Sequence, residues 1–423
     1  MKIINKLLIA IIILVGLLAA APLVFPYTMV IPQIEQKLGR FVHGKATIGN
    51  ITFRYAPRPI LTLHGVVIDK ADTATIGTLE IPLGIDMLLG DSYMLKGAHA
   101  ESARISSEFA QGLPQRLHSD PAGAGVETLS FSNSTITLQK GEIGPLSGQI
   151  TFYKDGRLSE ITLTANEGLN TMRITPAQDS GFMVEFQARN WTLPLAHAVK
   201  LDTVRLAGRT NQNGIDIDAI QATLYGGAVN GNGRLSWDQG WALQGQLQGK
   251  QLNAGPFLSV FSPVTRASGR MDGAANFSFK AEAVKNLLDN PAIQGRFEIK
   301  EGQLHNIDLV SPLKAQGNSV STHGGQTAFN LLSGAVSINP AGVTLSGLSL
   351  DSGKFRASGS ASIVNDKLAG SASTQLISGP VALSGRATLG GTLSTPQIST
   401  GGAARPGSSG EKAPAADEEI AAQ

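Results

Sequence analysis

Hydrophobic and polar residues alternate along most of the chain that follows residue 45. Phe182–Ala188 shows the pattern most clearly, because Phe182, Val184 and Phe186 alternate with Met183, Glu185 and Gln187. Successive side chains of a β-strand point to opposite faces, so a period of two predicts strands with one buried face and one solvated face. Phe182, Val184 and Phe186 are therefore candidates for lining an apolar sheet surface.

Runs of the same kind recur through the chain, and from residue 294 onward they return about every 8–12 residues, a spacing typical of all-β proteins. The pattern predicts a mainly β fold. The expected strands lie at residues 46–55, 60–68, 74–85, 127–138, 148–154, 159–165, 171–174, 182–188, 215–225, 227–237, 241–249, 295–300, 302–309, 335–338, 343–350, 355–364, 367–375 and 381–389.

Several of these segments contain an internal glycine, which weakens a strand and often marks a bulge or a sharp coil of the sheet. The repetition predicts a long curved antiparallel sheet built from similar hairpins, and not a compact sandwich. The glycines concerned are Gly231, Gly233, Gly269, Gly359 and Gly385.

A few segments depart from the alternation. Residues 32–38, 256–261 and 281–289 are expected to form short helices, and the Gly- and Pro-rich segment Gln111–Gly125 is expected to be a loop. A single sheet of roughly 25 strands would be at most ~120 Å long. Breaks at the loop and at residues 256–261 would shorten it.

The N-terminal segment follows a different pattern, since Leu7–Ile34 contains no charged residue. About 20 apolar residues suffice for a helix to cross a bilayer, so Leu7–Phe25 predicts a transmembrane anchor. Lys2 and Lys6 precede it, which favours a cytoplasmic N-terminus and a translocated remainder. The residues expected to contact the membrane include Leu7, Leu8, Ile11, Ile12, Leu14, Leu17 and Leu18.

Two alternatives compete with the anchor: a cleaved signal peptide and a buried core helix. Ala19–Ala21 fits a signal-peptidase site. Pro22 would then follow the cut directly, and the apolar run continues beyond it to Phe25, so the uncleaved anchor is favoured.

The composition of the chain disfavours some classes of function and excludes some kinds of site. Charged residues make up 16% of the chain and the net charge is +2, which disfavours nucleic-acid binding. The chain has no cysteine, which suits an oxidising compartment such as a periplasm and excludes disulfides and thiolate metal sites.

No pattern of residues indicates an enzyme, a cofactor site or a metal site. The histidines are scattered and no carboxylate stands at metal-ligand spacing. Ser311–Lys314 matches S-x-x-K without the companion motifs of that enzyme class. Asp216 and Asp218 share one strand face, an arrangement that is usually solvated.

Distributed motifs resemble the AsmA-like family. At the N-terminal end these are residues 34–40 (IEQKLGR), 46–51 (ATIGNI) and 57–63 (PRPILTL). In the second half they are Glu301–Leu309 (EGQLHNIDL) and Leu389–Pro396 (LGGTLSTP). The resemblance extends over roughly residues 1–400 and is weakest between Ile105 and Leu195.

This resemblance implies an inner-membrane-anchored periplasmic protein related to bridge-like lipid-transfer proteins. Its partners would be the phospholipid bilayer and lipid acyl chains, held in a taco-like β-groove during outer-membrane biogenesis. An envelope scaffold that binds periplasmic proteins or outer-membrane proteins in transit, through exposed strand edges, stays open as an alternative.

The expected organisation has six parts. They are a cytoplasmic stub and anchor (1–30), the start of the groove (31–110), a loop (111–125), a central sheet (126–250), an AsmA-like C-terminal β region (251–400) and a disordered tail (401–423).

Overall fold

The computed structural model describes residues 29–54, 58–83, 95–117, 125–137, 142–178, 181–193, 197–211, 213–283, 286–314, 319–321 and 325–400. The expected anchor residues and the expected tail at 401–423 lie outside these ranges. Within the described part of the chain, no helix is long and apolar enough to span a bilayer.

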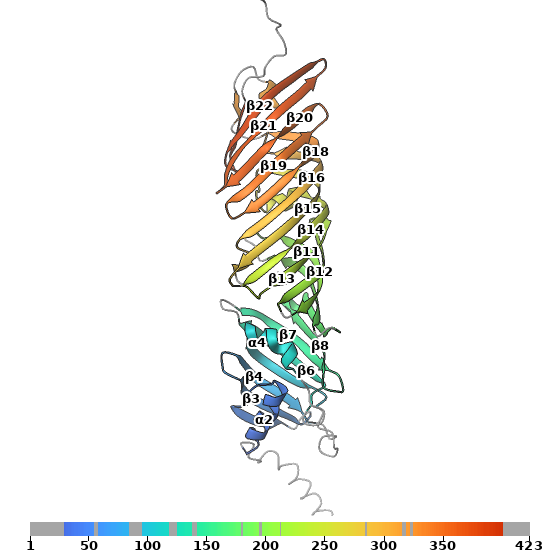
Figure 1. Ribbon diagram of the computed structural model, residues 1–423, viewed down its shortest axis with the longest axis vertical. Helices are drawn as coiled ribbons and strands as arrows, with labels where there is room; N and C mark the ends of the chain where they lie inside the picture. Colours follow the sequence, from blue (N-terminus) through green and yellow to red (C-terminus); the bar gives the residue numbers. More distant parts are fainter. Residues whose placement is uncertain are drawn as a thin grey trace, which may run out of the picture.

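The described residues form one long sheet with few helices, which confirms the mainly β prediction (Figure 1). The chain advances from one end of the molecule to the other, with the strands crossing the long axis obliquely. The strands are β1 (Ala46–Thr47), β2 (Asn50–Arg54), β3 (Ile60–Ile68), β4 (Ala74–Pro82), β5 (Ala98–Ser106), β6 (Thr128–Thr137), β7 (Glu142–Phe152), β8 (Leu158–Ala165), β9 (Asn170–Pro176), β10 (Phe182–Thr192), β11 (Lys200–Asn211), β12 (Gly214–Leu224), β13 (Gly227–Ser236), β14 (Trp241–Asn253), β15 (Arg266–Ala281), β16 (Pro291–His305), β17 (Ser319–Ser321), β18 (Gln326–Asn339), β19 (Gly342–Asp351), β20 (Phe355–Val364), β21 (Lys367–Ser378), β22 (Val381–Gly391) and β23 (Pro396–Thr400).

Among the described residues, strands pair antiparallel with their neighbours in the chain, with three departures. β1 and β2 both pair with β3. β5 and β6 pair in parallel, whereas the other pairs are antiparallel. β16 pairs directly with β18, while β17 pairs with β23 at the far edge.

The parallel pair has a local cause in helix α4 (Ser107–Arg116), which connects β5 to β6. Parallel strands need a crossover connection, usually a helix. Ser106 caps α4 by accepting a hydrogen bond from the Phe109 N–H at 3.1 Å. Phe109 and Leu113 pack against the sheet, so the loop expected at 111–125 is corrected: its first residues are helical.

Two other helices lie against the sheet. Helix α2 (Ile31–Phe41) packs Ile31, Ile34 and Leu38 on it, since residues three and four apart share one helix face. Helix α5 (Ala254–Ser259) follows β14 and contacts β15.

The positions of the helices correct two expectations. The sheet continues past α4 and α5, because both lie against it and neither interrupts the strand ladder. The α-helix expected at 281–289 is also corrected where it is described: β15 reaches Ala281, Asn286 belongs to a 3-10 turn, and residues 287–289 form a hydrogen-bonded turn.

The core at the N-terminal end of the sheet, which we call the proximal end, gives a test of the packing. Leu63 on β3 is fully buried, whereas Thr62 points to the opposite face of the sheet. Leu63→Ala should lower the free energy of unfolding by about 2–5 kcal/mol, because it leaves a cavity in a packed core. Denaturant unfolding of the purified protein measures this, with Thr62→Ala as the control. An equal effect of the two substitutions would contradict the assignment of the faces.

Candidate functional site

Direct cross-strand partners connect into one row that crosses the sheet from β2 to β23, and we call this row the apolar spine. Each member is Gly, Ala, Val, Leu, Ile, Met or Phe. In spatial order they are Ile51, Leu63, Leu79, Ala100, Phe131, Gly148, Leu163, Met172, Phe186, Leu206, Ile220, Gly231, Leu247, Ala275, Gly295, Val336, Leu345, Ala361, Gly370, Leu389 and Ile398.

The spine is long and free of polar side chains. At ~4.8 Å between neighbouring strands it extends over on the order of 95 Å. Directly opposed residues share a face of the sheet, so this row and its neighbours at i±2 define one apolar face. A ligand lying along the spine would contact only apolar residues.

Burial varies along the spine. Ile51, Leu63, Leu79 and Ala100 at the proximal end are buried, and Ile398 at the distal end is 3% exposed. Every member between them, from Phe131 to Leu389, is only half-buried. The spine is therefore covered at both ends and accessible along its middle.

Segments outside the strand ladder cover parts of the apolar face. At the proximal end α2 packs on the cluster that contains the four buried spine residues. At the distal end Leu309 and Leu313 belong to the same cluster as Ile398. Around α5, Leu258 and Val260 pack on one side of the apolar face.

The opposite face of the sheet carries cross-strand polar pairs. His99 hydrogen-bonds to Ser130 at 2.9 Å, and Arg173 forms an ion pair with Glu160 at 3.1 Å. Exposed ion pairs of this kind contribute at most about 1 kcal/mol each. These pairs place charged and hydrogen-bonding side chains on this face, whereas every residue of the spine on the other face is apolar.

Glycines shape the apolar face. The Phe277 ring lies over two neighbouring strands: a Cβ atom at Gly245 would come within 2.7 Å of its Cζ atom, and one at Gly233 within 3.5 Å. The glycines thus allow the aromatic ring to lie flat against the sheet. Gly269, in contrast, has φ of 129° beside a register shift, as expected of a bulge glycine.

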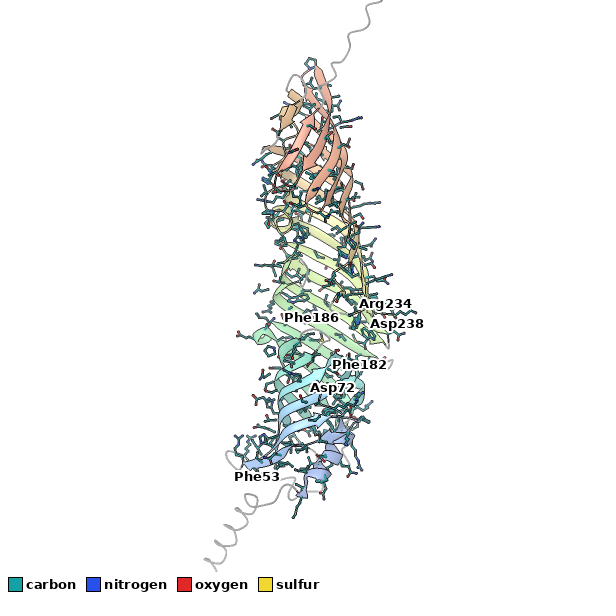
Figure 2. The ribbon with its side chains drawn as sticks, turned by 90° about the vertical axis from the view of Figure 1, so that its left-hand side faces the viewer. Phe53, Asp72, Phe182, Phe186, Arg234 and Asp238 are labelled. Carbon is teal, nitrogen blue, oxygen red and sulfur yellow. The ribbon has the colours of Figure 1, made fainter. Side chains whose placement is uncertain are left out.

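The predicted lining residues Phe182, Val184 and Phe186 stand two apart on β10 and therefore share the face of the spine; Figure 2 labels Phe182 and Phe186. Phe186 is a spine member and packs edge-to-face on Trp191, with ring centroids 5.3 Å apart. Val184 pairs with Gly208 and Ile174 in the adjacent row. Phe182 packs against the cluster of Ile150 and Ile161. Their contact with lipid stays a prediction.

Alternation alone missed the small members of the spine. The glycines Gly231, Gly295 and Gly370 are expected only to weaken their strands, and Ala275 lies outside the expected strands, yet each of the four pairs directly with Leu, Val or another small residue of the row. The signal that could have found them is their even spacing from large apolar residues of the same strand.

The residues that suggested catalysis lie in ordinary structural settings. Asp216 accepts a hydrogen bond from Arg234 at 2.8 Å, and Asp218 lies 3.9 Å from Arg209. Ser311–Lys314 forms the short helix α6. Among the residues that the structure describes, no group of three or more His, Asp or Glu side chains is placed to hold a metal ion.

Residues 169–346, which contain β9 to β18, match the sequence model of the AsmA family. This part of the chain is AsmA-like. Comparisons of this AsmA-like chain with curated proteins and with solved structures gave no match. An AsmA-like protein with a large open curved sheet fits, in general terms, a role in lipid transport or in the cell envelope.

The two ends of β19 give a test of the cover on the spine of this AsmA-like protein. Leu350 is 3% exposed, whereas the spine residue Leu345 is half-buried. Leu350→Ala should cost about 2–5 kcal/mol of folding free energy. Leu345→Ala should cost about 1 kcal/mol, because its side chain gains less from burial. Equal losses in denaturant unfolding would mean that the middle of the spine is covered like its ends.

Proposed function

We propose that this protein binds phospholipid acyl chains along the half-buried part of the apolar spine and conducts them within the cell envelope. The observation that carries the proposal is the unbroken apolar row whose middle is accessible from solvent. Contiguous exposed apolar surface larger than a few hundred Å² is uncommon on soluble proteins and normally serves binding.

The energetics favour a chain-like ligand. Each buried CH₂ group contributes about 0.8 kcal/mol, and a linear acyl chain distributes these contacts along a row and not in a compact pocket. The charged head group would stay in water at the margin of the sheet, where Arg234 and Asp238 lie (Figure 2). The spine itself carries no polar side chain that could bind a head group.

We also propose that residues 7–25 anchor the chain in the inner membrane and that the sheet lies in the periplasm. The described chain begins just beyond this segment, and α2 packs directly on the first spine residues. Such an anchor would hold the proximal end of the spine close to the bilayer that supplies lipid.

We infer a binding role and not an enzymatic one, because the paired carboxylates Asp216 and Asp218 are each engaged by an arginine. The scaffold alternative needs free strand edges. The edge strands among the described residues, β1, β2 and β17, have 2, 5 and 3 residues. Short edge strands are poor templates for pairing with another chain, so lipid binding is favoured.

Site-specific photo-crosslinking tests the ligand. A photo-crosslinking residue in place of Leu247, on the spine, should capture phospholipid in cells, whereas the same residue in place of Gln246, on the opposite face, should not. Mass spectrometry of the crosslinked protein identifies the adduct. Equal capture at both positions, or capture at neither, would contradict the proposal.

A charge on the spine tests the role in the envelope. Leu345→Asp should abolish function, because an acyl chain passing this point would have to desolvate a carboxylate. Thr344→Asp, its neighbour on the polar face, should leave function intact. Complementation of a deletion strain, scored by outer-membrane permeability at matched protein levels, measures both. Full activity of the Leu345→Asp variant would exclude conduction along the spine.

A further inference from the structure

The chain makes an excursion between β16 and β18 that the sheet itself does not require. These two strands pair directly, from Ile293 with Ile338 to His305 with Gln326. Between them the backbone travels to the far edge of the sheet, where β17 pairs with β23. The segment Asn306–Lys314, which we call the strap, begins this excursion and ends in α6, which contacts β17, β22 and β23.

Two leucines hold the strap on the apolar face. Leu309 and Leu313 are 6% and 4% exposed and belong to one cluster with the last spine residue, Ile398. Gly385 on β22 leaves the space for Leu313: a Cβ atom there would lie 2.8 Å from Leu313 Cδ2, and its next neighbour is a side-chain hydroxyl 3.5 Å away. The apolar face at β22 therefore has the space that the strap needs.

Hydrogen bonds give the strap a defined conformation. Asp308 Oδ1 accepts from the N–H groups of Val310 and Ser311, at 2.9 Å each, where α6 begins. The buried Thr327 hydroxyl accepts from the Leu309 N–H at 3.0 Å and donates to the Ile307 carbonyl at 2.9 Å. The strap is therefore a specific cover and not a loosely placed loop.

We propose that the strap is a gate over the distal end of the spine, displaced when an acyl chain advances to β22 and β23. This proposal rests on the proposed function. The strap occupies the surface that an acyl chain would need. Its two leucine side chains hold that surface through non-directional apolar contacts, whereas its hydrogen bonds lie within the strap and to Thr327. One acyl chain carries more methylene groups than two leucine side chains, so it can compete for the same floor.

A reversible lock tests the gate. The chain has no cysteine, so Leu313→Cys with Gly385→Cys introduces a single disulfide that fixes the strap in place. Photo-crosslinking residues are placed at Ile398, beneath the cover, or at Leu247, in the accessible middle. The locked protein and the same protein after reduction are incubated with vesicles of phosphatidylethanolamine and phosphatidylglycerol. The reduced form is the matched control for folding.

The gate predicts that oxidation lowers lipid capture at Ile398 several-fold while capture at Leu247 is unchanged. Gly385→Val, which fills the space of Leu313 without a second change, should raise capture at Ile398. Capture at Ile398 that is equal in both redox forms, or absent from both while Leu247 captures lipid, overturns the gate alone. Absence of capture at Leu247 overturns the proposed function and the gate with it.

Discussion

The structure depends on one constraint: each strand must place its apolar residues directly opposite those of the strand before it. A slip of one residue would move a polar side chain into the spine and an apolar one into water. Over the strands from β2 to β23 that slip does not occur, although register shifts interrupt several pairs, such as β11 with β12. The bulges absorb extra residues locally, and the apolar row continues through them.

The apolar face that results from this pairing is only partly exposed to water. The ends, where apolar side chains would meet solvent from more than one direction, are covered by α2 and by the strap. Along the middle, glycines and alanines occur among the larger members of the spine, and each of them reduces the apolar side-chain surface exposed there. The polar face carries hydrogen-bonded and ion-paired side chains across neighbouring strands.

The sequence predicted the class of fold well and the site only in part. The alternation around Phe186 identified strands and their apolar sides, because side-chain direction is a local property of the backbone. Membership of the spine depends on which residues meet across strands, and bulges such as the one at Gly269 alter this without a strong local signal. Helix α4 was not predicted, because Gly112 and Pro114 disfavour a helix. The strap was not predicted either, because the periodicity of a sequence does not indicate which distant strands pair.

The direct pairing of nearly every strand with its neighbour in the chain has a consequence for how such proteins vary in size. Because each hairpin contacts little beyond the next one, the sheet is a series of similar units of nearly equal width. Adding or removing one hairpin would change the length of the sheet by about 10 Å, and the chain would still leave the hairpin on the side of the sheet where it entered. An odd number of strands would reverse the direction of everything that follows. The length of the sheet can therefore change in steps of two strands while the spine stays apolar.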